Sequence, residues 1–277
     1  MKMMKKARIP VLAFVLSVAF ILCTVLPVGA IQFGTPDNNN HPYVVMCVFD
    51  VNGTAAWRTT GFLISPTVVI TAGHGTYGTD GARVTNNASI PTLGVNGYPG
   101  PGPWAVEAAA IYTHPDYRAE PGNGLPGFDA YDVGIVILSE PIVLSEYAAL
   151  PDPNLVESLP RLAGVDLVGY GVNYQQRGGG VSPYDAWRWY RQRYYAPASI
   201  VPSQDSMSDM FVKLTANPGQ GKGGTTFGDS GGPIFLAGTN IVIANNSFVT
   251  NSNCDGVTYA QRIDIPEVLD WINETID

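Results

Sequence analysis

Cysteine, charge and histidine are all scarce in this 277-residue sequence, and each shortage excludes a class of protein. Three cysteines cannot form the dense disulfide scaffold that holds many small secreted domains together. Only 14% of the residues are charged and the formal net charge is −8, so the chain is a poor partner for nucleic acid or an anionic membrane. The three histidines do not cluster with cysteines and carboxylates at metal-ligand spacing. We therefore expect no cofactor, no catalytic metal and no nucleic-acid partner.

Apolar residues and turn-forming residues are both abundant. Hydrophobic residues make up 45% of the chain, which excludes disorder, and 31 glycines and 22 prolines interrupt the apolar material with turns. Short β-branched or aromatic runs lie at residues 43–49, 61–64, 67–71, 105–112, 133–138, 165–170, 186–195, 210–214, 241–244 and 257–263. A helical period appears only near the end, after Pro266. These patterns predict an all-β fold with a C-terminal helix, either a double barrel or a large sandwich.

The first thirty residues have the organisation of an export signal. Four basic residues precede an apolar run over residues 11–26, and the small residues Gly29 and Ala30 follow. This pattern predicts a signal peptide over residues 1–30 and a secreted, extracellular product without stable membrane association. The alternative is an uncleaved anchor, for which the apolar run is short, since a span takes about 20 residues. Cleavage would leave Cys47 and Cys254; export permits a disulfide between them, but we favour two buried thiols.

Three segments carry residue types that work together in nucleophilic catalysis. His74 follows an apolar run, Asp132 opens another one, and Ser230 lies in the glycine-rich sequence of residues 228–233. A serine hydroxyl is a weak nucleophile unless a base takes its proton, and an imidazole can do so near neutral pH. The imidazole needs a carboxylate to hold its tautomer, and amides in a glycine-rich turn can stabilise an oxyanion.

Together these segments resemble the chymotrypsin/trypsin family of serine proteases, in which His, Asp and Ser occur in this order. Other similar segments lie at residues 61–74, 114–117, 169–171 and 270–272. The resemblance implies two six-stranded antiparallel β-barrels with an active site in the cleft between them. We place the first barrel at residues 31–145, the second at 146–262 and the closing helix at 263–277, with residues 150–160 crossing between the barrels.

The resemblance also implies a role for each matching residue. Ser230 is the expected nucleophile, His74 the base and then the acid, and Asp132 the residue that orients His74. The backbone N–H groups of Gly228 and Ser230 are expected to form the oxyanion hole. Asp129 is an alternative to Asp132, but no apolar strand follows it. His114 lies next to a proline in a loop, and we interpret it as structural.

Cleavage after Ala30 would create a new N-terminus at Ile31. In the family, a freed aliphatic N-terminus inserts beside the acid that precedes the nucleophile and orders the oxyanion hole. The resemblance therefore implies an ion pair between Ile31 and Asp229, since a buried carboxylate is costly unless a cation meets it. The alternative is that cleavage falls elsewhere and other donors hold Asp229.

The expected substrate pocket departs from that of trypsin. Six residues are aligned with it: Gly224, Thr225, Ser247, Phe248, Val249 and Val257. Gly224 stands where trypsin-like enzymes have an acid, which disfavours cleavage after Lys or Arg, although Asp255 nearby leaves a basic substrate open. Val249 and Val257 as walls would favour small aliphatic residues. The alignment of the wall could also slip by two residues toward Asn245. The family's disulfides at the histidine and at the pocket are missing, because Thr59, Gly75 and Thr226 occupy cysteine positions.

Taken as a whole, the sequence predicts a secreted serine endopeptidase, a monomer that acts on protein or peptide substrates. One alternative is a catalytically silent protease-like domain that binds protein partners, and another is an enzyme with the same three residues that acts on esters or on one dedicated protein. The run at residues 187–193 mixes basic and aromatic residues, but such alternation equally describes an antiparallel strand with a solvated face.

The leader prediction can be tested on the exported protein. We expect mass spectrometry to find Ile31 at its N-terminus, because the cleavage pattern ends at Ala30. A variant with one extra residue before Ile31 should lose most of its activity, since the new amino group could no longer reach Asp229. Undiminished activity of that variant would refute the ion pair.

Overall fold

The computed structural model describes residues 31, 33–90, 102–118, 129–171, 192–201, 209–216, 220–250, 254 and 256–277. The expected leader, Asp255 and residues 187–191 of the aromatic and basic run lie outside this part of the chain. Within the described residues, no helix has the length and apolarity needed to cross a membrane.

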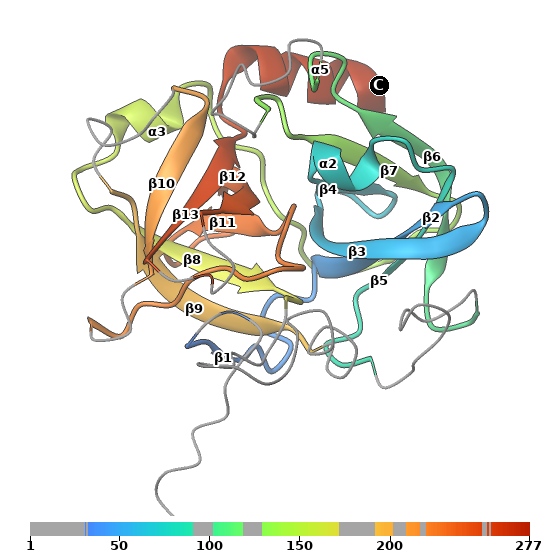
Figure 1. Ribbon diagram of the computed structural model, residues 1–277, viewed down its shortest axis with the longest axis horizontal. Helices are drawn as coiled ribbons and strands as arrows, with labels where there is room; N and C mark the ends of the chain where they lie inside the picture. Colours follow the sequence, from blue (N-terminus) through green and yellow to red (C-terminus); the bar gives the residue numbers. More distant parts are fainter. Residues whose placement is uncertain are drawn as a thin grey trace, which may run out of the picture.

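The first half of the chain forms a closed antiparallel barrel, seen on the right of Figure 1. Its strands are β2 (Val44–Val51), β3 (Thr54–Leu63), β4 (Val68–Thr71), β5 (Gly81–Thr85), β6 (Val106–Thr113) and β7 (Gly134–Leu138). They follow each other around the barrel in the order β2-β3-β4-β7-β6-β5. The strands β2 and β4 are almost wholly buried, as expected for β-branched and aromatic runs that line a closed core.

The second half forms a seven-stranded antiparallel sheet in the order β1-β9-β8-β11-β12-β13-β10. These strands are β1 (Thr35–Pro36), β8 (Gly164–Gly169), β9 (Tyr194–Ser199), β10 (Phe211–Ala216), β11 (Pro233–Leu236), β12 (Val242–Val249) and β13 (Gly256–Arg262). The strand β9, which β1 covers only at Tyr194 and Tyr195, meets the edge strand β10 through one bridge between Ile200 and Leu214. Hydrogen bonds from Val201 N–H to the Lys213 carbonyl and from Ser199 N–H to Thr215 Oγ1 add to this contact.

The predicted all-β class with two barrel-like sheets is confirmed, but the second sheet differs from a closed six-stranded barrel. It has a seventh strand, and among the described residues β9 and β10 meet in a single bridge instead of a ladder. The extra strand β1 comes from the N-terminal segment, where Thr35 pairs with Tyr195. This segment therefore belongs to the second sheet, although it precedes the first barrel in the chain.

Three helices complete the described structure: α2 (Gly73–Thr76), α3 (Leu155–Ser158) and α5 (Pro266–Ile276). The predicted C-terminal helix is α5, which has Pro266 in its first turn. It buries Val268, Leu269 and Ile272 in the hydrophobic core that includes the first barrel. Figure 1 shows α5 lying across one end of both sheets, so the last helix holds the two halves together.

A buried arginine also joins the two sheets. The Arg193 side chain is fully buried, and its Nε–H donates to Asp37 Oδ2 at 2.8 Å. Its Nη1 donates to the Val44 carbonyl at the start of β2 and to the Tyr170 hydroxyl. Since β9 follows Arg193 directly, one guanidinium connects the second sheet with the first barrel. No disulfide adds to this connection, because Cys47 and Cys254 are not bonded to each other.

Replacing Asp37 by Asn should strongly destabilise the protein, because it leaves the Arg193 charge buried without its carboxylate. We expect a loss of about 3–5 kcal/mol in the free energy of unfolding, measured by urea denaturation. The matched control is Asp129→Asn, whose partner Arg118 is 53% exposed and whose loss should cost at most about 1 kcal/mol. Equal effects of the two substitutions would contradict a special role of the buried pair.

Candidate active site

The strand β4 and the short helix α2 position His74. β4 ends at Thr71, Ala72 is the N-cap of α2, and His74 is the second residue of that helix. Gly73 lies so close to the segment just before β7 that an added Cβ would be only 2.9 Å from Val133 N. The absence of a side chain at Gly73 therefore lets the His74 turn pack against the segment that carries Asp132.

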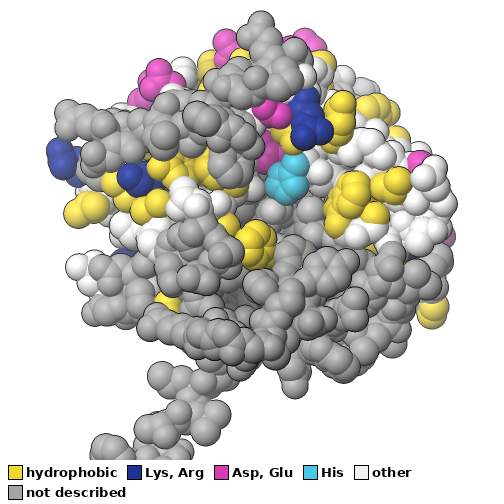
Figure 2. Space-filling view, in the orientation of Figure 1, with side chains coloured by type: hydrophobic (Ala, Val, Ile, Leu, Met, Phe, Trp, Pro, Cys, Tyr) yellow, Lys and Arg dark blue, Asp and Glu magenta, His cyan; other side chains and the backbone are white. Residues whose placement is uncertain are grey.

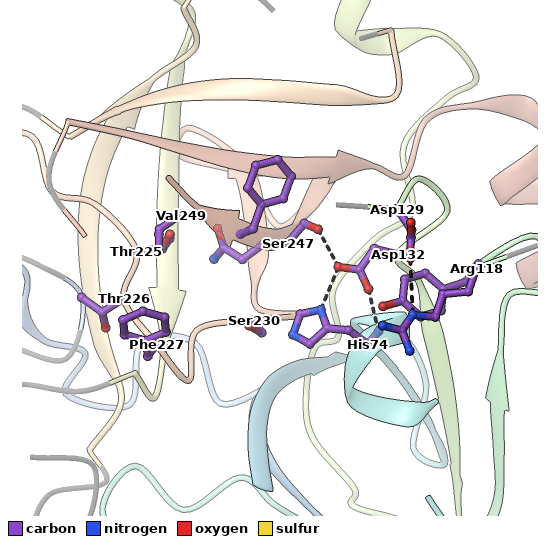
Figure 3. A pocket seen from close by; sticks show the side chains of 13 residues that line it. His74, Arg118, Asp129, Asp132, Thr225, Thr226, Phe227, Ser230, Ser247 and Val249 are labelled. Atoms are coloured by element: carbon purple, nitrogen blue, oxygen red, sulfur yellow. Dashed lines mark hydrogen bonds and ion pairs between the residues drawn. The ribbon is translucent and has the colours of Figure 1, made fainter. Parts of the chain in front are cut away.

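His74 and Asp132 make two hydrogen bonds with each other. The ring atom Nδ1 of His74 lies 2.8 Å from Asp132 Oδ2, and the His74 backbone N–H donates to Oδ1 at 2.7 Å. Figure 3 shows the imidazole held between this carboxylate and Ser230. Since Nδ1 is engaged by Asp132, the other ring nitrogen Nε2 is available to a hydroxyl on the pocket side.

Asp132 is buried and receives further support from the second sheet. The Ser247 hydroxyl donates to Asp132 Oδ2 at 2.5 Å, and Asn245 Nδ2 donates to the Asp132 carbonyl at 3.1 Å. Burial raises the pKa of this carboxyl, but the charge and hydrogen bonds of His74 and the Ser247 bond outweigh burial and lower it. Asp129, the alternative considered above, instead accepts a bond of 3.4 Å from Arg118 Nε. The structure thus pairs His74 with Asp132.

Opposing influences act on the protonation of His74. Burial disfavours the imidazolium and so lowers the pKa, and the positive charge of Arg118 acts in the same direction. The Asp132 carboxylate, through its charge and its hydrogen bond, acts in the other direction and raises the pKa of His74 above its usual value of 6.5. The side chain is still 36% exposed, and Figure 2 shows a histidine at the surface beside basic and acidic side chains. A proton acceptor at this position is accessible to a substrate.

Ser230 lies in a tight turn that packs against the strand leading to His74. The Thr60 backbone N–H donates to the Ser230 carbonyl at 2.9 Å, and Gly231 N–H donates to the Asn246 carbonyl at 2.7 Å. An added Cβ on Gly231, whose φ is 75°, would lie 2.4 Å from Ala72 N. Only glycine fits there, and this close approach places Ser230 in the same pocket as His74.

The turn also presents backbone donors. Gly228 has a φ of 95°, a left-handed conformation that favours glycine. Within the described part of the chain, neither Gly228 N–H nor Ser230 N–H donates to a protein acceptor. Two uncommitted amides beside a serine are the donor set that a developing oxyanion requires.

Asp229 is fully buried behind this turn. It accepts hydrogen bonds from Gly171 N–H at 2.7 Å and from Thr226 N–H at 2.8 Å. Burial raises its pKa to about 7, although these amides and the charge of Arg58 act in the opposite direction. The Arg58 guanidinium packs on the same turn, since an added Cβ on Gly228 would lie 3.3 Å from Arg58 Cζ. Arg58 could not be expected here from the sequence, because an arginine in a strand is ordinarily a surface residue.

Ile31 is buried, and its side chain packs in the hydrophobic cluster of the second sheet. In the full-length chain its nitrogen belongs to the peptide bond with Ala30 and carries no charge. The ion pair between Ile31 and Asp229 therefore stays a prediction that depends on cleavage.

The pocket beside Ser230 has a volume of about 310 Å³ and is open to solvent. Its described lining consists of His74, Tyr117, Arg118, Asp129, Asp132, Thr225, Thr226, Phe227, Ser230, Asn246, Ser247, Phe248 and Val249. Figure 3 shows Thr225 and Val249 on one side of Ser247, with Arg118 and Asp129 beyond His74 on the other. The pocket thus extends across both sheets.

Two of the residues expected in the pocket do not line it. Gly224 is buried next to Thr225, and Val257 packs with a small cluster around Phe211 and Tyr259. Side chains alternate along β13, and Thr258 faces Thr225, whose hydroxyl bonds to it at 2.9 Å. Val257 therefore lies on the opposite face of β13 from Thr258, in the cluster that also holds Phe248, and it is not among the described residues that line the pocket.

The remaining histidines have structural contacts. His114 is buried and stacks on Tyr131 with ring centroids 4.7 Å apart, outside the pocket lining. His41 binds Asp37 and stacks on Tyr195. Among the residues that the structure describes, no three His, Cys, Asp or Glu side chains gather in a way that could hold a metal ion.

Known proteins share the family and the fold of this chain. The trypsin family model matches residues 31–272, so the chain belongs to the trypsin family. No curated protein sequence matches the chain.

Among solved structures, HL collagenase is similar with a TM-score of 0.65 and 16% identity, covering 91% of this chain and 98% of that one. Mouse neuropsin, a serine protease, has a TM-score of 0.59 and 16% identity, covering 86% of this chain and 96% of that one. Human heparin binding protein has a TM-score of 0.59 and 15% identity, covering 87% of this chain and 94% of that one. At these identities the structures share the chymotrypsin-like fold. The family supports a peptidase function, with protein or peptide substrates.

Asp229 should give the stability of the uncleaved chain a distinctive pH dependence. Its pKa is about 7 in the folded state and near 3.8 when unfolded, so the folded state holds the extra proton between these values. Stability from this group is therefore lost as pH rises from about 4 to 7, by at most about 4 kcal/mol. The stability of Asp229→Asn relative to the parent should rise over the same range, measured by urea unfolding with Ile31 still linked to Ala30. A difference that does not change with pH would contradict this assignment.

Proposed function

We propose that the protein is a secreted serine endopeptidase that acts through Ser230, His74 and Asp132. The observation that carries the proposal is the joint position of these groups: a carboxylate on His74 Nδ1, a serine in the same pocket, and two uncommitted amides beside that serine. The residues come from segments more than fifty positions apart in the chain. Membership of the trypsin family supports the same reaction class.

In the proposed reaction, Ser230 Oγ attacks the carbonyl carbon of the peptide bond and its proton passes to His74 Nε2. The oxyanion of the tetrahedral intermediate accepts hydrogen bonds from Gly228 N–H and Ser230 N–H. The C–N bond then breaks, and His74 returns the proton to the leaving amine. Asp132 stays ionised throughout and stabilises the imidazolium.

The acyl group on Ser230 is released by water. His74 removes a proton from the water as it attacks the acyl carbon, and the proton passes back to Ser230 Oγ when the acid product leaves. The leader predicted over residues 1–30 supports secretion of this enzyme, and its removal would supply the Ile31 amino group to Asp229.

A fluorophosphonate probe tests this proposal directly. The folded protein should acquire one label at Ser230, because the probe reacts with serines that a neighbouring base activates. Ser230→Ala should abolish labelling and Asp132→Asn should slow it by about four orders of magnitude, as measured by intact mass. The exposed Ser139→Ala is the matched control and should label like the parent.

Absence of a label on the folded parent protein would overturn the proposal. That result would instead favour the catalytically silent binding domain considered above.

A further inference from the structure

Asn246 is a buried pocket residue that the proposed chemistry does not use. The side chain lines the pocket beside Ser230 and is only 2% exposed. Neither Oδ1 nor Nδ2 has a hydrogen-bond partner among the described residues. A buried polar group without a hydrogen-bond partner destabilises the folded state by about 1–3 kcal/mol. A bound molecule that pairs with the Asn246 amide would remove this cost.

The strand β12 explains why this amide faces the pocket. Its neighbours Asn245 and Ser247 both direct their side chains to Asp132. Because successive side chains of a strand alternate between two faces, Asn246 points away from Asp132. Its backbone is bonded on both sides to the catalytic turn, from Gly231 N–H to the Asn246 carbonyl and from Asn246 N–H to the Gly232 carbonyl. The amide is thus held in a constant position relative to Ser230.

The pocket lining has two sides, one around Asn246 and one beyond His74. Among the described residues, the lining around Asn246 contains polar and apolar side chains but no charged one. Thr225 has a hydroxyl that donates to Thr258, and Phe227, Phe248 and Val249 provide apolar surface. The charged side chains Arg118 and Asp129 lie beyond His74 (Figure 3). The carboxylate of Asp132 is occupied by His74 and Ser247.

We propose that this part of the pocket receives the substrate side chain that precedes the scissile bond, and that this side chain is a carboxamide, glutamine or asparagine. The assignment rests on the peptidase function proposed above and names its substrate class. A carboxamide offers one donor group and one acceptor, so it can pair with both Nδ2 and Oδ1 of Asn246. A carboxylate would leave Oδ1 facing a negative charge, and an aliphatic side chain would leave both atoms unpaired.

A cationic side chain fits less well, since the described residues place no unoccupied carboxylate beside Asn246. The small aliphatic preference expected from Val249 and Val257 is also disfavoured, because Val257 is not among the described residues that line the pocket. A site built around hydrogen bonds discriminates strongly against side chains that cannot make them.

Peptidyl phosphonates that differ only in the residue before the reactive phosphorus test the proposal. In each case Ser230 Oγ bonds to phosphorus, phenoxide leaves, and His74 takes the hydroxyl proton. The labelling rate is measured by intact mass for probes carrying Gln, Glu, Met or Lys. We expect the Gln probe to react at least about tenfold faster than the Glu probe and the similarly sized Met probe.

Variants of Asn246 separate this role from catalysis. Asn246→Leu should lower the ratio of the Gln-probe rate to the Met-probe rate at least about tenfold. Asn246→Asp, which keeps the size of the side chain, should move the preference toward Lys. Asn273→Leu, at an exposed position of α5, is the matched control and should keep the parent profile.

The outcomes distinguish the two proposals. Equal rates for the Gln, Glu and Met probes, or an unchanged profile in Asn246→Leu, would overturn the carboxamide assignment while fluorophosphonate labelling of Ser230 upheld the enzyme. A parent protein that no phosphonate labels would overturn the proposed function, and the carboxamide assignment with it.

Discussion

The buried carboxylate of Asp132 is the constraint on which the site depends. A carboxylate away from water is costly unless donors surround it, and here the donors come from both halves of the molecule. His74 approaches from the first barrel, whereas Ser247 and Asn245 approach from β12 of the second sheet. Satisfying one charged group therefore requires the two sheets to dock in one arrangement, and this arrangement also brings Ser230 to His74.

Buried polar groups recur wherever the two sheets meet. Arg193 bonds to Asp37 and to the beginning of β2, and Arg58 packs beneath the turn that carries Asp229. These contacts connect the two sheets without the help of a disulfide between Cys47 and Cys254, which are not bonded to each other. Hydrogen bonds of buried arginines are directional, so they specify how the sheets are oriented even where their net contribution to stability is modest.

The strands that could be predicted are those whose burial shows as an apolar run, such as β4, β7 and β8. The strand β5 was not predicted, because an arginine such as Arg83 is ordinarily a surface residue. The structure shows that Arg83 is buried and that its Nη2 lies 2.6 Å from Asp50 Oδ1, which neutralises its charge. The two-residue β1 has no pattern of its own and exists through its pairing with β9. Asp132 could be preferred over Asp129 because an apolar strand follows it. The place of Asn246 in the pocket could not be predicted, because a bulge near residue 247 shifts the strand register between Asn246 and Phe248.

The sequence by itself determined the all-β class, the C-terminal helix and which residues could carry nucleophilic chemistry, because these follow from local periodicity and from the reactivity of the residue types. Only the tertiary structure decided which side chains share a pocket. It paired His74 with Asp132, placed Asn246 in the pocket lining and Val257 in the cluster around Phe211 and Tyr259, and left β9 and β10 joined by a single bridge. These outcomes depend on the alternation and register of strands far apart in the chain, and a shift of one residue would turn every side chain of a strand to the opposite face.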